Sequence, residues 1–320
     1  MTTTDFNVSV IIPVYNAEKF ITEAVESVLI QTGVHEIILI EDGSKDLSLK
    51  ICMNLANEYA NVKLYTHPNG ENRGAGASRN LGIIQATAKY IAFLDADDIY
   101  LPNRFVKENE FIEKNNDFDA MYGALGNRYH NEVLEEKYKN KIFANVTVLR
   151  LENEFMNPFE SLSGFNFKNM GHIHLNTLTI NLEKLKQMSY FFNDTLRLHQ
   201  DTEFIIRLSY HIDLTPGIID TPITIRGVHE SNRITKFTFS HKKYYQNQLK
   251  AWESLLAWAE KEKISAPYLR YFKLRVYSLT IATLPLAKAW AFFAKIFTKH
   301  FSIVKYYKLY YKNLTNQLIS

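Results

Sequence analysis

Residues 90 to 98 read YIAFLDADD and join a buried-strand pattern to an acidic cluster. Tyr90 to Leu94 form a short, mostly apolar run that is typical of a strand covered on both faces. Three carboxylates, Asp95, Asp97 and Asp98, follow within four positions. Open α/β sheets bind ligands beyond the carboxyl ends of their parallel strands, so this pattern predicts the three acids at a ligand crevice.

Three carboxylates so close together repel one another, and they need a cation or a set of donors to stay ionised together. Oxygen ligands suit a hard divalent cation such as Mg²⁺ or Mn²⁺, particularly one that also holds phosphates. The alternative for this stretch alone is a strand followed by an Asp-rich turn and a helix cap, since Asp is favoured in both settings. The neighbouring segments favour the metal site.

Strand-like and helical patterns alternate through the first 123 residues. The strand-like runs are 8–12, 36–40, 62–65, 90–94 and 118–122. The helical patterns are 17–31, 46–59, 72–86 (a tight glycine-containing loop that feeds a closely packed helix) and 102–114. This alternation predicts an α/β fold with a mostly parallel sheet and helices on both faces.

The second half of the chain is less regular. Residues 124–170 are irregular, polar and aromatic, as expected of substrate-facing loops. A strand is expected at 175–180, a helix at 201–211 and a last strand at 218–226, and the sequence is helical from about Phe237 onward. We expect a catalytic domain over 1–235, with a nucleotide-sugar-binding half to about 123 and an acceptor-side half over 124–235, followed by a helical region over 236–320.

Cysteine content, the amino-terminal sequence and charge indicate where in the cell the protein is expected. The single cysteine, Cys52, cannot form an internal disulfide, which fits a reducing, cytoplasmic location. The amino terminus lacks the pattern of a secretory signal, and no uninterrupted apolar run of about 18 residues predicts a spanning helix. The net charge is only +3, but no Asp or Glu occurs after Pro267, where Lys and Arg alternate with aromatic residues.

Several polar groups converge on the predicted sheet edge. Tyr15 follows the first strand-like run and Asp42 follows the second, while the glycine-containing segment carries Arg73 and Arg79. An aromatic platform, an acid, a cation and a metal site are what a nucleoside diphosphate requires. The glycines of GAGASRN match neither a phosphate-binding loop nor a dinucleotide fingerprint, which argues against an NTPase and a dehydrogenase.

Four blocks in this order resemble those of the family 2 glycosyltransferases, which have the A-type glycosyltransferase fold. The blocks are VSVIIPVYNAEKFITEAVESVLIQT (8–32), IILIEDGSKD (37–46), NRGAGASRNLGI (72–83) and YIAFLDADD (90–98). The resemblance implies a metal-dependent, inverting transfer from a nucleotide-sugar, with a UDP-sugar favoured. The acceptor would be a hydroxyl group of a glycan or lipid-linked molecule, in bacterial surface polysaccharide or lipid-linked glycan synthesis.

The resemblance also implies roles for single residues. Tyr15 would line the pocket of the base, Asp42 would hold the base, and Arg73 would lie beside the base or the phosphates. Asp95 would contact the ribose, and Asp97 would bind Mn²⁺ or Mg²⁺ under the diphosphate. Asp98 would support the site or cap the next helix. The remaining expected nucleotide-sugar contacts are Pro13, Asn16, Arg79 and Ala96.

Two segments of the second half extend the resemblance. In HQDTEFIIRL (199–208), Asp201 matches the catalytic base, whereas Gln200 replaces the acid that commonly precedes it. An inverting displacement needs one carboxylate within hydrogen-bond reach of the acceptor hydroxyl; the alternative is that Asp201 only caps a helix. In IRGVHESNR (225–233), His229 would bind the metal or the diphosphate, with Arg226 and Arg233 as phosphate partners.

The basic, aromatic and acid-free residues 268–320 suit the surface of an anionic bilayer, which would make the protein peripheral on the inner face of the plasma membrane. The alternative is a helical subdomain whose aromatic residues pack onto the catalytic domain. Without a recognised motif, nucleic acid is not expected as a partner.

Two other functions stay open. A nucleotidyltransferase would want a glycine-rich, basic loop after the first strand, which PVYNAEKF is not. A non-catalytic nucleotide-sugar-binding module would not need the acids that this chain keeps.

Overall fold

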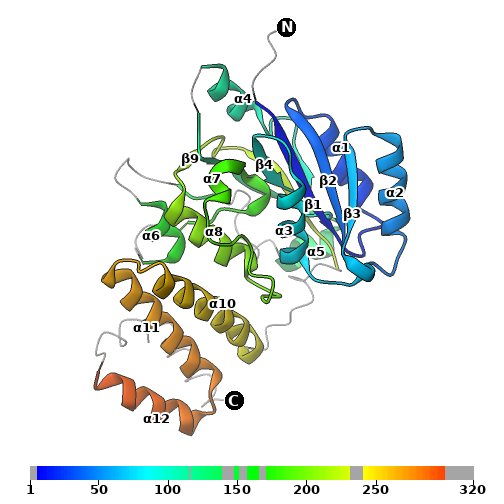
Figure 1. Ribbon diagram of the computed structural model, residues 1–320. Coiled ribbons are helices and arrows are strands. Elements are labelled where there is room, and N and C mark those ends of the chain that lie inside the picture. Colours follow the sequence, from blue (N-terminus) through cyan, green and yellow to red (C-terminus); the bar gives the residue numbers. More distant parts are fainter. Residues whose placement is uncertain are drawn as a thin grey trace. The chain divides into compact units, whose positions relative to one another are not determined.

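The computed structural model describes residues 6–114, 117–138, 148–150, 157–165, 171–230 and 241–299. The chain forms two compact units (Figure 1). The sheet unit contains residues 1–197 and 204–236, and the C-terminal unit contains residues 198–203 and 237–320. The expected domain boundary near residue 235 lies outside the described residues.

A seven-stranded sheet forms the centre of the sheet unit, and its strand order is β3-β2-β1-β4-β8-β6-β9. Strands β1, β2, β3 and β4 are parallel, while β8 runs antiparallel to both β4 and β6. The predicted mostly parallel sheet is thereby confirmed. The strands are β1 (Val8–Val14), β2 (Val34–Glu41), β3 (Val62–Thr66), β4 (Tyr90–Phe93), β6 (Ala120–Tyr122), β8 (Leu178–Asn181) and β9 (Leu214–Pro216).

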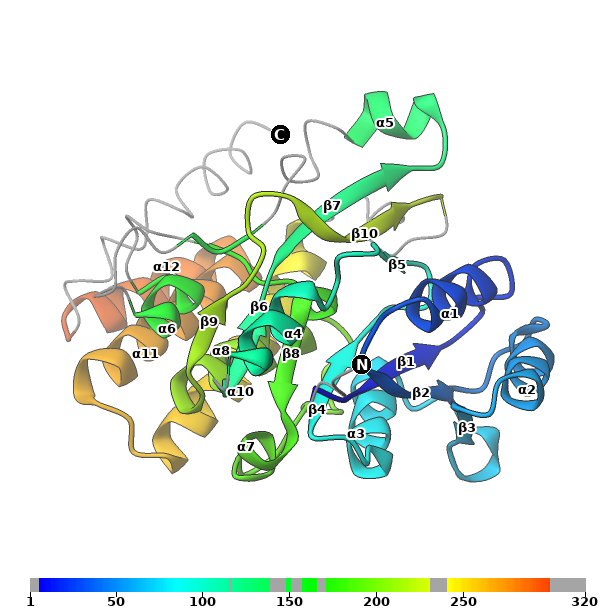
Figure 2. The ribbon, with the colours of Figure 1, turned by 90° about the horizontal axis from the view of Figure 1, so that it is seen from above.

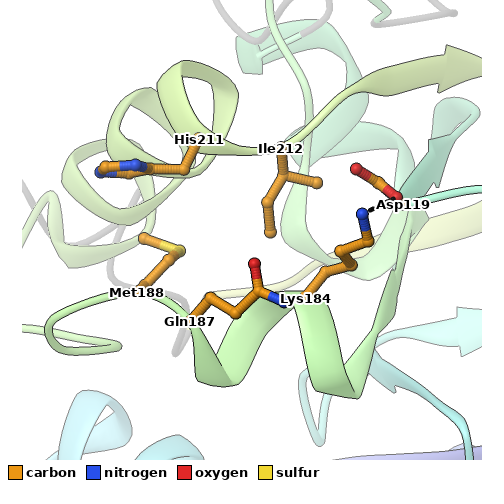
Figure 3. A pocket seen from close by; sticks show the side chains of 6 residues that line it. All are labelled: Asp119, Lys184, Gln187, Met188, His211 and Ile212. Carbon is orange, nitrogen blue, oxygen red and sulfur yellow. Dashed lines mark ion pairs between the residues drawn. The ribbon is translucent and has the colours of Figure 1, made fainter.

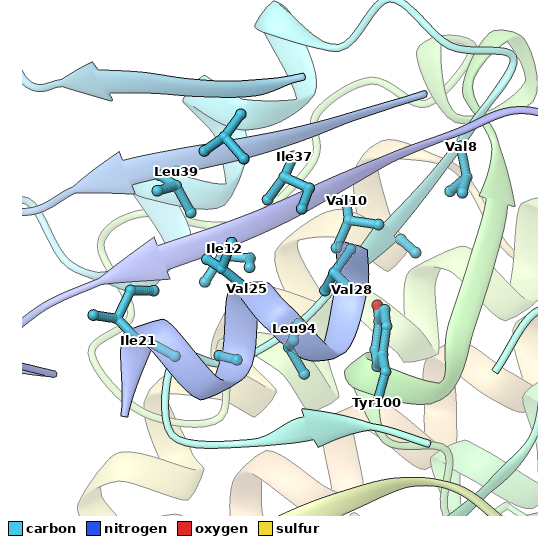
Figure 4. Packing of buried hydrophobic residues seen from close by; sticks show 14 of the residues in the cluster. Val8, Val10, Ile12, Ile21, Val25, Val28, Ile37, Leu39, Leu94 and Tyr100 are labelled. Carbon is cyan, nitrogen blue, oxygen red and sulfur yellow. The ribbon is translucent and has the colours of Figure 1, made fainter. Parts of the chain in front are cut away.

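Helices cover both faces of this sheet. Successive residues of β1 point to opposite faces, so they pack against different helices. Val10 and Ile12 pack with Val25 of helix α1 (Figure 4), whereas Ile11 joins Ile83 of α3 in the core on the other face. A Cβ added at Gly82 of α3 would lie only 2.3 Å from Ile11, so glycine permits the close packing that the sequence predicted. The helices are α1 (Ile21–Leu29), α2 (Ser48–Glu58), α3 (Ala75–Gln85) and α4 (Val106–Glu113), with the 3-10 turn η1 (Pro68–Gly70) before α3.

A second, three-stranded sheet has the order β5-β10-β7 (Figure 2). Strand β10 (Pro222–Val228) was expected at 218–226, but β5 (Ile99–Tyr100) and β7 (Ala124–Tyr129) were not predicted. The irregular structure expected from 124 onward was therefore wrong for β7. Only the first three residues of β7 are buried, and its partner β10 is distant in sequence, so the local pattern carries little strand signal.

The remaining elements of the second half are short. The strand expected at 175–180 is divided between a 3-10 turn and β8, and two helices lie inside the stretch that was expected to be irregular. These elements are α5 (Glu132–Tyr138), α6 (Pro158–Ser163), η2 (Leu175–Thr177), α7 (Leu182–Lys186) and α8 (Gln200–His211). Helix α8 begins in the C-terminal unit and ends in the sheet unit.

The C-terminal unit is helical over its described residues, as the sequence predicted. It contains α10 (His241–Lys261), α11 (Ala266–Thr283) and α12 (Leu286–Phe297). Trp252 and Trp258 of α10 are buried, and their rings lie 5.3 Å and 6.4 Å from that of Phe272 on α11. In the part of the chain that the structure describes, no helix combines the length and the apolar character that crossing a membrane requires.

Candidate active site

The acidic loop, residues Asp95 to Asp98, follows β4 at the sheet edge where β1 also ends. The chain leaves β1 towards β2 on one side, and β4 later pairs with β1 on the other side. Ligands bind at such a switch point in open parallel sheets. Each of the three carboxylates has a partner of its own in the sheet unit.

Asp97 is paired with His229, whose Nε2 lies 3.0 Å from the carboxylate Oδ2. His229 directly follows β10. A Cβ at Gly227 would lie 2.4 Å from the carbonyl oxygen of Asp97, so only glycine lets β10 run this close to the acidic loop. The structure thus brings together the two residues that the sequence predicted as metal ligands.

Asp95 is paired with Arg79, and the guanidinium Nη2 lies 2.5 Å from Oδ1. Arg79 is buried on α3, and its guanidinium carbon lies 5.5 Å from the centre of the Phe192 ring. An arginine held in this way orients Asp95. The contacts of Arg79 and of the buried Ala96 with a nucleotide-sugar stay predictions.

Asp98 is buried beneath the loop. Its Oδ1 accepts the backbone N–H of Gly227 at 2.9 Å, and its Oδ2 accepts Nδ2–H of Asn176 at 2.5 Å. Burial, together with the charges of Asp97 and Asp95, raises the pKa of Asp98 well above its usual range. Asp98 therefore fits the supporting role, because it fastens the acidic loop to β10 and η2.

Asn176 is a site residue that sequence reasoning missed. It is fully buried, its side-chain oxygen accepts the N–H of Asp95 at 3.2 Å, and its carbonyl accepts Nε–H of the buried Arg104 at 3.2 Å. His130 was also missed; its ring centre lies 5.4 Å from that of His229. No spacing in the sequence links either residue to the acidic loop, because both reach it only through the fold.

Asp42 ties the loop after β2 to the start of α3. Its buried carboxylate accepts the backbone N–H of Arg73 at 2.6 Å and that of Gly74 at 2.9 Å. The preceding acid, Glu41, accepts the N–H groups of Gly43 and Ser44. The carboxylate of Asp42 therefore orders the loop that carries Arg73. Its contact with a nucleotide base stays a prediction.

The remaining donor-side residues lie at the same edge. Tyr15 is 43% exposed just beyond β1, and Pro13 lies within β1 opposite Ile40 of β2. Asn16 links the loops after β1 and β2, because its Oδ1 accepts the N–H of Lys45 at 2.8 Å. An exposed ring above an ordered pair of loops is a suitable platform for a base.

Arg226, one of the two predicted phosphate partners, lies on β10 close enough to the acidic loop to act on the charge of Asp98. It is half-buried on β10, and its charge acts to lower the pKa of Asp98, against the stronger effect of burial. Arg233 lies outside the described residues.

Asp201 lies in the first turn of α8, within the C-terminal unit. Its Oδ1 accepts the N–H of Thr202 at 2.8 Å, and Glu203 shares the same turn. The positive end of the helix dipole favours negative charge at this position. The role of Asp201 as base stays a prediction.

The Asp97–His229 pair can contribute to a cation site. Across the described ranges, no three acidic, histidine or cysteine side chains converge so as to hold a metal by themselves. One carboxylate and one imidazole nevertheless form a mixed donor set that can bind a divalent cation. Cations that act on phosphates commonly take only one or two protein ligands and complete their shell with phosphate oxygens and water. The pair therefore fits a cation shared with a diphosphate.

A separate pocket of about 200 Å³ opens at the other edge of the sheet, where β4 begins (Figure 3). Its lining includes Lys184, which forms an ion pair with Asp119 at 3.2 Å. The residues predicted to bind the nucleotide-sugar are not part of this lining. The full lining is Asp119, Lys184, Gln187, Met188, His211 and Ile212.

Known proteins share parts of this chain. An uncharacterized glycosyltransferase of Rickettsia felis is 44% identical over 113 residues, which are 35% of this chain and 18% of that protein. The minor teichoic acid biosynthesis protein GgaB of Bacillus subtilis is 34% identical over 154 residues, 47% of this chain and 17% of that protein. Glycosyltransferase GlyA of Streptococcus pneumoniae is 26% identical over 250 residues, 72% of this chain and 34% of that protein. This chain thus spans well under two thirds of these relatives.

A solved structure shares the fold. TarS 1-349 of S. aureus in complex with UDP-GlcNAc superposes with a TM-score of 0.59 at 18% identity, over 87% of this chain and 72% of that one. The expected A-type glycosyltransferase fold is thereby confirmed. The sequence also matches the family described as Glycosyl transferase family 2 over residues 9–173, more than half of the chain, and the chain therefore belongs to glycosyl transferase family 2.

Proposed function

We propose that this chain transfers a sugar from a nucleoside-diphosphate-sugar to an acceptor hydroxyl with inversion at the anomeric carbon. The observation that carries the proposal is the acidic loop at the switch point, where Asp97 meets His229 and Asp95 meets Arg79. This arrangement offers a charged, hydrogen-bonded cradle for a diphosphate and a ribose beside the exposed Tyr15.

Asp201 is the base of the proposed reaction. It takes the proton of the acceptor hydroxyl while that oxygen forms a bond to the anomeric carbon. The bond from the anomeric carbon to the diphosphate oxygen breaks on the opposite face, and its electron pair leaves with the nucleoside diphosphate. Attack and departure on opposite faces produce the inversion.

Asp97 and His229 are the residues that would hold Mn²⁺ or Mg²⁺ in this reaction. When bound, the cation supplies charge neutralisation for the departing diphosphate. The protein itself keeps the two ligands 3.0 Å apart through the close approach of β10 to the acidic loop.

The nature of donor and acceptor rests on the relatives. The structure of TarS was solved with UDP-GlcNAc, which supports a UDP-sugar as donor. GgaB is a teichoic acid biosynthesis protein, which supports a hydroxyl group of a cell-surface polymer or its lipid-linked precursor as acceptor.

A thermal-shift panel of nucleotide-sugars, with and without Mn²⁺, tests this function. A ligand at about 100 times its Kd stabilises the folded state by about 2.7 kcal/mol. We expect a UDP-sugar to raise the melting temperature more with Mn²⁺ than without it. Pyrophosphate release from a nucleoside triphosphate would instead indicate a nucleotidyltransferase. Donor binding without donor hydrolysis or transfer, under any condition with Mn²⁺, would indicate a binding module.

We also propose that α12 lies on an anionic bilayer, which would bring the enzyme to a lipid-linked acceptor. Leu286 and Trp290 are exposed on α12, while Ala289 and Ile296 pack against α11. Lys288 and Lys295 are exposed on the same helix, and no acid occurs in the sequence after Glu262. Residues 300–320 of the basic region lie outside the described residues.

Tryptophan fluorescence tests the membrane contact. The chain has three tryptophans. Trp290 is 49% exposed, whereas Trp252 and Trp258 are buried. A shift of the emission maximum on binding therefore reports on Trp290. A blue shift is expected with vesicles that contain anionic lipid and not with zwitterionic vesicles. Equal binding to both kinds of vesicle, or binding unchanged by Trp290→Ser, would contradict this part of the proposal.

A further inference from the structure

The turn that carries Asp201 is held by helix α10 of the C-terminal unit. We define the base turn as residues 199–203, from His199 through Glu203. Two contacts join it to α10: Ser254 donates its hydroxyl to Oε1 of Glu203 at 2.8 Å, and the ring of Tyr244 lies 6.1 Å from that of His199, edge to face. We infer that Ser254 and Tyr244 are positioning residues for the catalytic base, an inference that rests on the role of Asp201 proposed above.

The Ser254–Glu203 hydrogen bond is the stronger of the two contacts. Glu203 is completely buried, two residues after Asp201 in the same helical turn. Removing the donor of a buried hydrogen bond is costly, because the acceptor loses a partner that water does not replace. Because a helical turn moves as a unit, a displacement of Glu203 displaces Asp201 with it.

The backbone of His199, at the start of the base turn, has an uncommon conformation. His199 has φ of 61°, in the left-handed region that residues other than glycine rarely adopt. Its carbonyl accepts the N–H of Glu203 at 3.0 Å and so closes the first turn of α8. Such conformations persist where the surrounding structure over-determines them, and they gather at functional sites.

Tyr244 supports the base turn on the His199 side. Its hydroxyl accepts Nε2–H of Gln248 at 2.8 Å, one turn further along α10, which fixes the orientation of the ring. Burial raises the pKa of Tyr244, so the phenol stays neutral in its contact with the imidazole of His199. The base turn is thus clamped at both ends, by Tyr244 at His199 and by Ser254 at Glu203.

This clamp gives the C-terminal helical region a role in turnover besides any role in docking. A base that is misplaced by about 1 Å can lose about a hundredfold in rate, even when the change lies away from the chemistry. We expect α10 to control kcat while leaving donor binding unaffected, because the donor-binding residues lie in the sheet unit.

Ser254→Ala in the full-length enzyme tests the inference. We expect kcat to fall about 10-fold to 100-fold, with the KM for the donor and the affinity for UDP with Mn²⁺ unchanged. Ser254→Thr keeps the hydroxyl and should restore most of the activity. Ser278→Ala is the matched control, because Ser278 is also buried in the C-terminal unit and its hydroxyl has no hydrogen-bond partner among the described residues.

A double variant separates this inference from the proposed function. If Ser254 acts only through Asp201, then Ser254→Ala adds no further loss to Asp201→Asn. Normal kcat in Ser254→Ala, an equal loss in Ser278→Ala, or a further loss in the double variant would overturn the positioning role. Normal transfer by Asp201→Asn would instead remove the base from the proposed function, and the positioning role with it.

Discussion

The acidic loop and the base turn differ in which parts of the protein hold them. The acidic loop is fastened by Arg79 from α3, Asn176 from η2, and Gly227 and His229 from β10 and its end. The base turn is fastened by α10 through the contacts of Ser254 and Tyr244. Three elements of the sheet unit therefore help to place the acidic loop, whereas the contacts described for the base turn come from α10.

The largest expected effect lies in the base turn. Asp201→Asn keeps the shape of the side chain but removes the carboxylate that we propose as the base, so transfer should fall by about 10²–10⁴. Calorimetry should find the affinity for UDP with Mn²⁺ unchanged, since no donor contact is lost. The control is Asp220→Asn, at an exposed acid in the sheet unit. Wild-type turnover by Asp201→Asn would assign the base elsewhere.

A smaller effect on activity is expected when one of the side chains that hold the acidic loop is removed. Asn176→Ala removes the hydrogen bonds to Asp98 and to the N–H of Asp95 and should weaken donor binding with Mn²⁺ by about 10-fold to 100-fold. Leaving Asp98 buried without this donor should cost about 1–3 kcal/mol of unfolding free energy.

The matched control for Asn176→Ala is Asn181→Ala. Asn181 caps α7 at the other edge of the sheet, where its Oδ1 accepts the N–H of Glu183. Losing this cap should cost about 1 kcal/mol of stability and leave donor affinity alone. Equal donor affinities for the two variants would show that Asn176 only stabilises the fold.

Substitution of the buried acid Glu36 should lower stability without affecting sugar transfer. Its buried carboxylate accepts from Ser9 at 2.7 Å and from the N–H of Thr87 at 2.8 Å, and it pairs with Lys63 at 2.6 Å. Burial by itself would raise the pKa of Glu36, but these partners outweigh it and lower the pKa from 4.5 to about 2. The stabilisation is therefore complete above pH 4.5 and is lost as the pH falls towards 2.

Denaturation at several pH values checks this effect. Glu36→Gln should lower the free energy of unfolding by about 1–3 kcal/mol at pH 7 and make it less dependent on pH below 4.5. Sugar transfer at pH 7 should be unchanged, because Glu36 is not among the residues of the site. A loss of transfer with unchanged stability would contradict this separation.

The first part of the sheet unit could be predicted because its signals are local. Strand β4 and the acids that follow it are adjacent in sequence, and parallel strands bring their carboxyl ends to one edge. The same rule predicts Tyr15 and Asp42 at the edge that carries the acidic loop. Fold class and the position of the site follow from such patterns.

The second half resisted prediction because its contacts are distant in sequence. Strand β7 forms on β10, and Asn176 reaches Asp95 and Asp98 only after both segments have folded. His130 approaches His229 in the same way. A single sequence shows the periodicity within one helix or strand. It does not show which elements, distant in sequence, will pair in the fold.

The most direct test of the account is calorimetric titration of UDP into the wild type and into Asp97→Asn, each with and without Mn²⁺. Asp97 and His229 are proposed to share a cation with the diphosphate. We therefore expect Mn²⁺ to tighten UDP binding by about 10-fold or more in the wild type and to have no effect in Asp97→Asn, with equal metal-free affinities. The same Mn²⁺ enhancement in both proteins would contradict the account.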